Sequence, residues 1–381
     1  MPHLVPEGSL DDQQRLHLKT IKENPNQSYW ISGFAGSGKT VLLYYFLRDL
    51  HREGKKVSFV TFTHTLLQLF NSITNELGVN GVFHNTIYQY FHLNPLTDVL
   101  ICDEIQDFSR MMIDNLRHQN IKLLVSGDSN QSIYKKDPVY ESEVLPSHIS
   151  MEAINAIELK LVINHRLPRV VIRSINKILG SNSMWSGADG TKEGTLTYYR
   201  GNSINDEVNF ILKDATQKTH NAGKTVVLLF STQKFLIEFS QIALEISNCQ
   251  RYHSPYQFNS FNNYLENLNI PLEIVVNKSG NLKIAEQKRK IVAMTMHGSK
   301  GLDFDTVIIP FFSNSYEIYP VHPELENTLL MVAMSRAKND LIFSYSGTAH
   351  NKLQPLLDSG ICQRMLDAEF VGTNNNIKLD F

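Results

Sequence analysis

The chain has 381 residues, which at roughly 100–200 residues per domain predicts two or three domains. Hydrophobic residues make up 42% of the chain and charged residues 19%, which fits a soluble globular protein and argues against long disordered tails. The 36 Lys and Arg residues nearly balance the 38 Asp and Glu residues, so the net charge of −2 does not indicate nucleic-acid or membrane binding by itself.

The sequence shows no sign of a membrane segment or of a disulfide framework. No apolar run approaches the roughly 18–20 residues that a membrane span needs, and the first residues lack the pattern of a secretory signal. We therefore expect a cytoplasmic protein with no membrane partner. The cysteines Cys102, Cys249 and Cys362 are odd in number and far apart, which excludes a CxxC metal site.

Short apolar runs of strand length recur along the chain, and many are separated by helical patterns such as residues 235–246. The runs lie at 27–32, 57–62, 99–102, 123–125, 226–230, 291–294, 307–310 and 341–345. Most of them do not alternate with polar residues, as is typical of parallel strands that are buried on both faces. The pattern predicts an α/β fold in which parallel sheets are flanked by helices.

The predicted strands fall into two sets, which indicates two lobes. Residues 135–150 contain two prolines and several acidic residues, so they are expected to form a surface connection that leads to the boundary. We place an N-terminal lobe at residues 1–155 and a C-terminal lobe at residues 156–381.

The segment that follows the first predicted strand has the pattern GxxxxGK[ST] in full: Gly33, Phe34, Ala35, Gly36, Ser37, Gly38, Lys39 and Thr40. Glycines in this arrangement let backbone N–H groups surround phosphates at a helix N-terminus. Lys39 can then neutralise phosphate oxygens, and the Thr40 hydroxyl can bind Mg²⁺. A Gly-rich turn that happens to precede a helix is the alternative, and the strand and helix on either side make it much less favoured.

Two adjacent carboxylates, Asp103 and Glu104, come directly after the apolar run at 99–102. The carboxyl end of a parallel strand is where a second Mg²⁺ contact belongs in this kind of site. One carboxylate can hold the metal while its neighbour orients or deprotonates an attacking water. Taken alone the pair would more often be a solvated strand end, so the prediction of hydrolysis depends on its partnership with the phosphate loop.

The segment 103–107 and the later segment 127–134 resemble motifs II and III of the UvrD/Rep-like superfamily 1 helicases. Further segments resemble other motifs of that family in the family's order. They are Leu10–Gln14 for the adenine-reading Q motif, Thr61–His64 for motif Ia, Asn164–Arg166 for motif IV, Met294–Phe304 for motif V and Val332–Ala337 for motif VI. The resemblance implies two RecA-like lobes with ATP and Mg²⁺ bound between them.

The resemblance also implies a role for each matching residue. The implied catalytic residues are Glu104 as base, Gln131 as the sensor of the γ-phosphate, and Arg166 and Arg336 as arginine fingers from the second lobe. Thr40 and Asp103 are the implied Mg²⁺ ligands. Besides the phosphate loop, the implied nucleotide contacts are Gln14, His165 and Asp303. The implied nucleic-acid contacts are Thr63, His64, Tyr134, Thr295 and His297.

The chain departs from the family pattern at several points. Lys135 and Lys136 follow Tyr134 where the family has an aromatic residue that stacks on a base, and His165 stands where a Tyr is usual. The short stretch between Phe70 and Asp98 leaves no room for the family's inserted accessory domain. We therefore expect a minimal form that hydrolyses ATP but unwinds duplexes poorly when alone.

The function implied is an ATP-dependent helicase or translocase on single-stranded DNA, with 3′→5′ polarity and with RNA left open as the track. Such chains serve repair, recombination or anti-phage defence, often alongside a nuclease, which here would act in trans. The first alternative is a nucleotide- or DNA-gated regulatory subunit of such an effector. The second is a pseudo-enzyme that only binds nucleotide.

Two segments outside these motifs could serve either binding or ordinary packing. Residues 251–264 interleave aromatic residues with Asn, and residues 288–290 form a short basic run. Either segment could contact nucleic acid or a partner. The ordinary alternative is a core helix followed by a solvated strand edge, and it is favoured because charge runs are common.

Overall fold

The computed structural model describes residues 5–62, 67, 70, 73–137, 139–180, 192–276 and 279–365. Its contacts divide the chain into two compact units, and the division falls between Arg166 and Leu167. The boundary predicted between residues 155 and 156 is therefore too early. The reason is β6 (Ala156–Leu161), which pairs with β1 (Ser28–Gly33) and so completes the first sheet before the chain leaves that unit.

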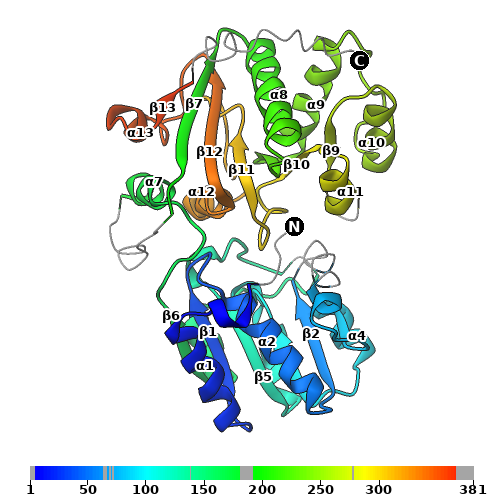
Figure 1. Ribbon diagram of the computed structural model, residues 1–381, viewed down its shortest axis with the longest axis vertical. Helices are drawn as coiled ribbons and strands as arrows, with labels where there is room; N and C mark the ends of the chain where they lie inside the picture. Colours follow the sequence, from blue (N-terminus) through cyan, green and yellow to red (C-terminus); the bar gives the residue numbers. More distant parts are fainter. Residues whose placement is uncertain are drawn as a thin grey trace. The chain divides into compact units, whose positions relative to one another are not determined.

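In the described part of the first unit, the strands form a six-stranded sheet with the order β3-β2-β4-β5-β1-β6 (Figure 1). Every neighbouring pair runs parallel, as predicted. Besides β1 and β6, the strands are β2 (Val57–Thr61), β3 (Phe83–Thr86), β4 (Val99–Cys102) and β5 (Lys122–Gly127). Because parallel strands end at the same edge of a sheet, the segments that follow β1, β4 and β5 lie side by side.

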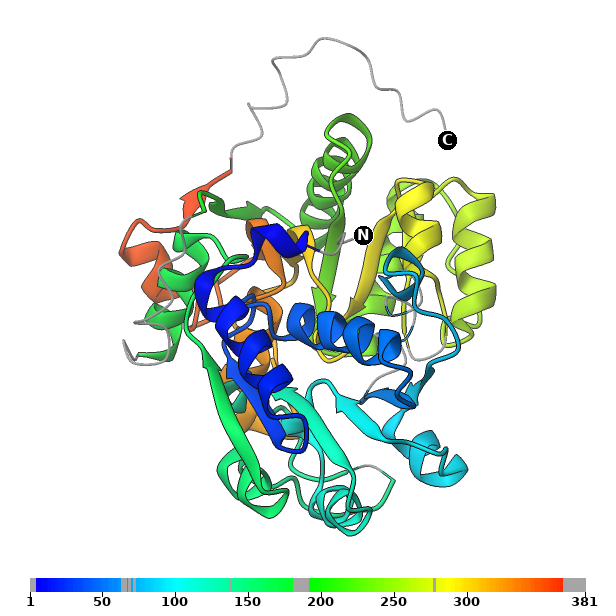
Figure 2. The same cartoon turned by 60° about the horizontal axis from the view of Figure 1, so that its bottom comes forward.

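Helices cover both faces of this sheet, because successive strand residues point to opposite faces. Tyr29 and Ile31 pack with α1 and α2, whereas Trp30 between them packs with α4 and α5. Figure 2 shows α1 and α2 on the same side of the strands. The helices are α1 (Asp12–Glu23), α2 (Lys39–Arg52), α4 (Ile87–Leu93), α5 (Arg110–His118) and α6 (Ser147–Ala153).

The described part of the second unit holds a seven-stranded parallel sheet with the order β13-β7-β12-β11-β8-β10-β9. Its strands are β7 (Thr195–Gly201), β8 (Val226–Phe230), β9 (Leu272–Ile274), β10 (Ile291–Thr295), β11 (Phe304–Ile309), β12 (Ala337–Ser346) and β13 (Gln363–Arg364). Its helices are α7 (Arg169–Leu179), α8 (Ile204–Asn221), α9 (Gln233–Ile246), α10 (Phe258–Asn267), α11 (Leu282–Gln287), α12 (Glu326–Met334) and α13 (Gln354–Asp358).

The prediction of an α/β fold with parallel, helix-flanked sheets is confirmed, and each predicted apolar run forms a strand. The strands that the sequence pattern missed lie toward the edges of the two sheets. β6 alternates exposed and buried residues, and β9 is only three residues long. Such strands lack the continuous apolar run that identifies a strand with both faces buried.

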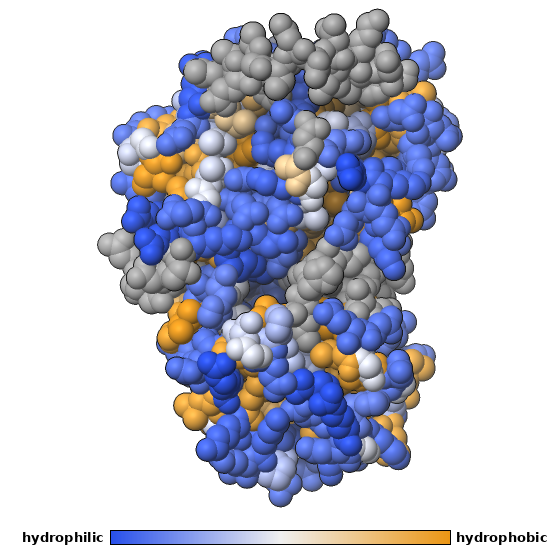
Figure 3. All heavy atoms as spheres, viewed as in Figure 1, coloured by the Kyte–Doolittle hydropathy of each residue, from blue (hydrophilic) through white to orange (hydrophobic). Residues whose placement is uncertain are grey.

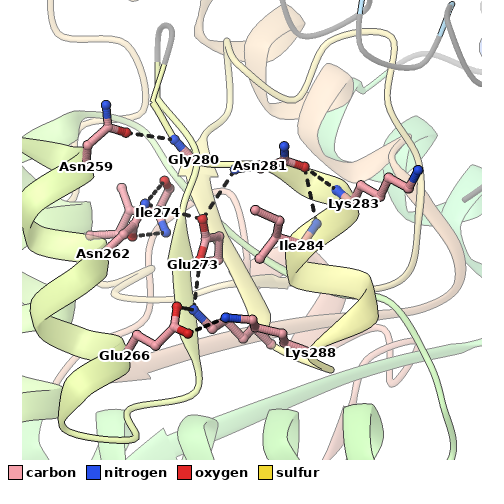
Figure 4. A network of polar contacts seen from close by, with 11 residues as sticks. Asn259, Asn262, Glu266, Glu273, Ile274, Gly280, Asn281, Lys283, Ile284 and Lys288 are labelled. Atoms are coloured by element: carbon pink, nitrogen blue, oxygen red, sulfur yellow. Dashed lines mark hydrogen bonds and ion pairs between the residues drawn. The ribbon is translucent and has the colours of Figure 1, made fainter.

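The basic run at 288–290 directly precedes β10 and forms ion pairs with residues of α10 and β9 in the second unit (Figure 4). Lys290 is buried and its Nζ lies 3.0 Å from a carboxylate oxygen of each of Glu266 and Glu273. Lys288 pairs with Glu266, and the Arg289 guanidinium donates to a backbone carbonyl oxygen of α8. These contacts support the ordinary structural alternative for this run rather than a nucleic-acid contact.

The aromatic stretch at 251–264 is used in a similar way. Arg251 forms ion pairs with Glu238 and Glu245 of α9. The Tyr252 ring stacks on Phe261, with 5.1 Å between centroids, and it also contacts the Tyr264 ring. Most of the stretch therefore serves the packing of α10.

On the face seen in Figure 3, hydrophilic side chains predominate, and hydrophobic ones form separate small groups. None of the helices in the described part of the chain combines the length and the hydropathy that crossing a bilayer requires.

A buried carboxyl group in α8 supports the start of the loop after β11. Glu207 is fully buried, and its Oε1 accepts hydrogen bonds from the Phe311 backbone N–H and the Ser344 hydroxyl, both at 2.7 Å. Phe311 has a left-handed backbone with a φ of 61°, which a side chain other than glycine rarely adopts. Burial raises the pKa of Glu207 from 4.5 to about 7.

This raised pKa predicts that the second unit loses stability as the pH rises. Between about pH 4.5 and pH 7 the folded state binds the Glu207 proton more tightly than the unfolded state, so the free energy of unfolding falls across that window. We expect Glu207→Gln to be more stable than wild type at pH 8, by on the order of 3 kcal/mol. Its free energy of unfolding should not show the fall between about pH 4.5 and pH 7. Urea unfolding at pH 5, 6, 7 and 8 measures the free energy of unfolding of both proteins. The exposed Glu193→Gln is the control, and an unchanged slope in Glu207→Gln would contradict the prediction.

Candidate active site

The phosphate loop lies between β1 and α2, as predicted, and its glycines are required by its geometry. Gly36 and Gly38 have φ angles of 82° and 91°, in the left-handed region that favours glycine. A Cβ atom on Gly38 would lie 2.3 Å from the Gln14 Nε2 atom, and one on Gly36 would lie 2.7 Å from the Arg166 Cβ atom. The loop therefore admits no side chain at these two positions.

The loop holds a buried cation and a buried hydroxyl group. Lys39 is 9% exposed, and its Nζ donates to the backbone carbonyl oxygens of Gly33 at 2.8 Å and Phe34 at 3.2 Å. The Ser37 hydroxyl is buried and has no hydrogen-bond partner in the described structure. A phosphate group would supply acceptors for both side chains, so the residues present fit a nucleotide.

Thr40 and Asp103 meet at the edge of the sheet. The Thr40 hydroxyl donates to Asp103 Oδ2 at 2.8 Å, and the other carboxylate oxygen accepts from the Ser126 hydroxyl and from the Glu104 backbone N–H. Burial, together with the neighbouring Glu104 charge, raises the pKa of Asp103. A hydroxyl and a carboxylate in contact are oxygen ligands of the kind that Mg²⁺ takes beside a phosphate.

Glu104 has an unusual backbone, with a φ of 60°. It lies after the end of β4 and directly before a short 3-10 turn. Left-handed conformations of residues other than glycine cluster at functional sites, where the surrounding structure stabilises them. The Glu104 carboxylate accepts a hydrogen bond of 2.5 Å from Gln106 Nε2, while Gln106 Oε1 accepts one of 3.1 Å from the Asp128 N–H.

Gln106 is thus a site residue that the sequence reasoning did not select, although it lies within the segment quoted for motif II. Its side chain is buried and joins the segment after β4 to the segment after β5. Nearby, Gln131 is also buried, and its Nε2 donates to Asp128 Oδ2 at 2.7 Å. Adjacent parallel strands therefore bring Glu104 and the motif III segment together, as expected from the sequence.

The structure corrects the predicted location of Asn164, His165 and Arg166. They were assigned to the second lobe, but they lie in the first unit, against the phosphate loop. Asn164 Nδ2 donates to the Ala35 carbonyl oxygen at 2.7 Å, and the His165 backbone N–H donates to the Gly36 carbonyl oxygen at 3.0 Å. The physical reason is that β6 runs parallel to β1, so both strands end at the same edge of the sheet.

The start of α1 reaches the same loop. Gln14 is buried and its Nε2 donates to the Ser37 carbonyl oxygen at 3.1 Å. Asp11 caps α1 by accepting from the Gln14 N–H, and its other carboxylate oxygen lies 2.7 Å from His165 Nε2. The roles in adenine contact that the resemblance implies for Gln14 and His165 stay predictions.

In the second unit, Arg336 is buried and held by its own surroundings. Its guanidinium donates to the carbonyl oxygen of Val332 at 2.8 Å, to that of Leu302 at 3.1 Å and to the Ser335 hydroxyl at 2.8 Å. Asp303 lies 3.5 Å from Lys338 Nζ. As an arginine finger, Arg336 would have to leave at least part of this arrangement.

The predicted nucleic-acid contacts are described only in part, because Thr63 and His64 lie outside the described residues. Tyr134 is half-buried, and its ring lies 5.2 Å from the Phe62 ring. Thr295 Oγ1 accepts from the Gly298 N–H, and the His297 ring meets Tyr319 edge to face. Burial lowers the pKa of His297 to about 4, so it is neutral at physiological pH.

Comparison with known proteins finds two family models that match parts of this chain. Residues 236–348 match the family described as UvrD-like helicase C-terminal domain, and residues 11–139 match the one described as Nephrocystin 3, N-terminal. The ATP-dependent DNA helicase PcrA of Bacillus subtilis is 27% identical over 182 residues, which cover 45% of this chain and 22% of the relative. The predicted resemblance of this chain to the UvrD/Rep-like superfamily 1 helicases is therefore confirmed.

The UvrD-like match covers α9 to β12 and so includes Thr295, Asp303 and Arg336. The PcrA helicase of Leuconostoc citreum is 23% identical over 190 residues, which cover 48% of this chain and 24% of the relative. The aligned residues thus span less than a quarter of the length of these curated relatives.

Two solved structures share features of the fold with this chain. One is the C-terminal domain of a possible DNA helicase from Lactobacillus plantarum, with a TM-score of 0.36, 12% identity, and coverage of 52% of this chain and 98% of that one. The other is from a study of DNA unwinding at forked duplex DNA by two coordinating Pif1 helicases. It has a TM-score of 0.46, 13% identity and coverage of 95% of both chains.

Proposed function

We propose that this chain is an ATPase that uses Mg²⁺ and acts as a superfamily 1 translocase on single-stranded DNA. The observation that carries the proposal is the contact of Thr40 with Asp103, with Lys39 in the same phosphate loop and Glu104 next in sequence. These four groups supply what phosphoryl transfer to water needs: a metal site, a cation for the phosphates and a base. The printed names of the PcrA relatives, which are ATP-dependent DNA helicases, support the choice of nucleotide and of nucleic acid.

Each residue would contribute a separate part of the chemistry. Thr40 and Asp103 would hold the magnesium ion, which neutralises charge on the phosphates when bound. Lys39 would exchange the carbonyl oxygens of Gly33 and Phe34 for phosphate oxygens. Glu104 would orient the attacking water and accept its proton.

The remaining catalytic groups would act on the terminal phosphate. Gln131 would contact it from the segment after β5, and Arg166 and Arg336 would stabilise the charge that develops on it. Asp303 would contact the nucleotide from the second unit. A guanidinium suits this task because it is permanently charged and can bind two phosphate oxygens at once.

The track that we propose is single-stranded DNA, contacted by Thr63, His64, Tyr134, Thr295 and His297, with movement in the 3′→5′ direction. RNA stays open as a second track. We expect translocation with little unwinding by the chain alone, because it lacks room for the accessory domain after motif Ia. A location in the cytoplasm likewise stays a prediction.

A second candidate function is a nucleotide- or DNA-gated regulatory ATPase subunit of an effector such as a nuclease, in repair or anti-phage defence. The observation that favours it is the segment after Tyr134, where Lys135 and Lys136 replace an aromatic residue. The buried Asp137 that follows accepts a hydrogen bond from the Tyr88 hydroxyl at 2.6 Å. A chain with weaker base stacking would hold its strand less firmly, since one base–aromatic stack is worth about 1–3 kcal/mol.

Steady-state ATPase measurements with and without single-stranded DNA and RNA test the proposal. They are made at low and moderate salt, because binding through phosphates depends strongly on ionic strength. We expect DNA to raise the rate by at least about tenfold, as the free energy of strand binding favours the closed, active state. Hydrolysis that neither strand changes would support the regulatory-subunit alternative, and no hydrolysis at all would support a pseudo-enzyme.

A further inference from the structure

Three successive carbonyl groups of the phosphate loop are held from outside the loop. Ala35 O accepts from Asn164 Nδ2 at 2.7 Å, and Gly36 O accepts from the His165 backbone N–H at 3.0 Å. Ser37 O accepts from Gln14 Nε2 at 3.1 Å. Two of the three donors come from the segment that follows β6, and the third comes from α1.

Holding a carbonyl oxygen fixes the direction of the next N–H group. In a planar trans peptide the C=O and the N–H that follows it point in opposite directions. The Asn164 contact therefore turns the Gly36 N–H away from the 164–165 segment, and the Gln14 contact turns the Gly38 N–H away from α1. Backbone N–H groups of such a loop are the donors that bind phosphate oxygens.

Asn164 makes a second hydrogen bond, which joins it to Arg166. It is 2% exposed, and its Oδ1 accepts a hydrogen bond of 3.0 Å from the Arg166 backbone N–H. Its two side-chain atoms thus join the phosphate loop to the backbone of Arg166, whose side chain packs over Gly36. The fit is tight, because a Cβ atom on Gly36 would lie 2.9 Å from Asn164 Oδ1.

From this geometry we infer that Asn164 is a positioning residue that sets the phosphate loop in its binding conformation and places Arg166 beside it. The inference rests on the proposed nucleotide site and adds a residue that acts through other groups. Its main effect is on nucleotide affinity, since the loop N–H groups depend on the Ala35 peptide. A second effect falls on kcat, since Arg166 depends on the Oδ1 contact.

Two substitutions of Asn164 separate this role from a general effect on folding. Asn164→Leu keeps the side-chain size but removes both hydrogen bonds, and we expect the Kd for the fluorescent nucleotide mant-ATP to rise about tenfold. Asn164→Asp keeps the acceptor for Arg166 but replaces the donor that faces Ala35 O. We expect a similar rise at pH 8, and a smaller fall in kcat than in Asn164→Leu.

Lowering the pH provides a readout that a merely structural role would not move. The carboxyl group introduced by Asn164→Asp is buried, which favours its protonation, and in that form it can donate to Ala35 O again. We therefore expect its Kd, divided by the wild-type Kd at the same pH, to fall from about tenfold at pH 8 to within about threefold at pH 5.5. The corresponding ratio for Asn164→Leu should not change with pH.

Gln27→Leu is the matched control. Gln27 Nε2 donates to the carbonyl oxygens of Ser28 and Asn155, both at 3.1 Å, so it joins the start of β1 to the residue before β6, at the opposite end of these strands from the phosphate loop. Its Kd should stay within about twofold of wild type. Thermal midpoints of all variants establish that they are folded.

Several results would overturn the inference. One is wild-type affinity in folded Asn164→Leu, and another is an equal loss of affinity in Gln27→Leu. If Asn164→Leu does not fold, the inference is overturned when the Kd of Asn164→Asp, divided by the wild-type Kd at the same pH, does not change with pH. Wild-type protein that binds mant-ATP without hydrolysing ATP would refute the proposed ATPase and leave the comparison of Kd values intact. No binding by wild type would overturn both.

Discussion

Glu104→Gln should lower the kcat for ATP hydrolysis by about 10²–10⁴-fold while leaving nucleotide affinity close to that of wild type. The amide has nearly the size of the carboxylate, and it cannot accept the proton of the attacking water. Glu104 has a left-handed backbone, and the hydrogen bond from Gln106 Nε2 orients its carboxylate. Rapid-quench measurement of hydrolysis with saturating DNA gives kcat, and mant-ATP titration gives affinity.

Asp98→Asn is the matched control for this experiment. Asp98 precedes β4 at the end of the strand opposite Glu104, where its carboxylate accepts a hydrogen bond of 2.8 Å from the Lys56 N–H. Its loss should leave kcat within about twofold of wild type, since it lies far from the phosphate loop along the strand. Hydrolysis by Glu104→Gln at the wild-type rate would rule out Glu104 as the base.

Arg166→Ala should lower kcat by about 10³-fold, because arginine fingers contribute about 10³–10⁵-fold in other phosphoryl-transfer enzymes. The Arg166 side chain lies over Gly36, at the loop that would hold the phosphates. Arg166→Lys should recover little of the loss, since a lysine ammonium cannot bind two oxygens in one plane. Single-turnover hydrolysis, with the enzyme in excess over ATP and at a concentration above the Kd, measures the effect on the chemical step without interference from product release.

Arg173→Ala is the control for the loss of a positive charge, because Arg173 is exposed on α7, close in sequence to Arg166. A kcat of Arg166→Ala within about threefold of wild type would leave Arg336 as the only candidate finger. The same substitution at Arg336 is a poorer test. Its guanidinium is buried and donates hydrogen bonds to Val332, Leu302 and Ser335, so Arg336→Ala would destabilise the second unit as well.

The relation to the UvrD-like helicases could be predicted from the sequence because its signals are local. The phosphate loop needs glycines at fixed spacing before a helix, and Asp103 and Glu104 directly follow a continuous apolar run. The strands of both sheets that are buried on two faces could be predicted for the same reason. Each of these features depends on residues that are close together in the chain.

Only the tertiary structure decided which unit holds Asn164, His165 and Arg166. β6 is an edge strand with alternating exposure, so its sequence does not reveal that it pairs with β1 and ends beside the phosphate loop. The role of Gln106 as a bridge to Asp128, and the ion pairs that use the basic run at 288–290, depend on the same kind of information. The partner of a side chain is set by which strands are neighbours, and the order of strands in a parallel sheet is not the order of the chain.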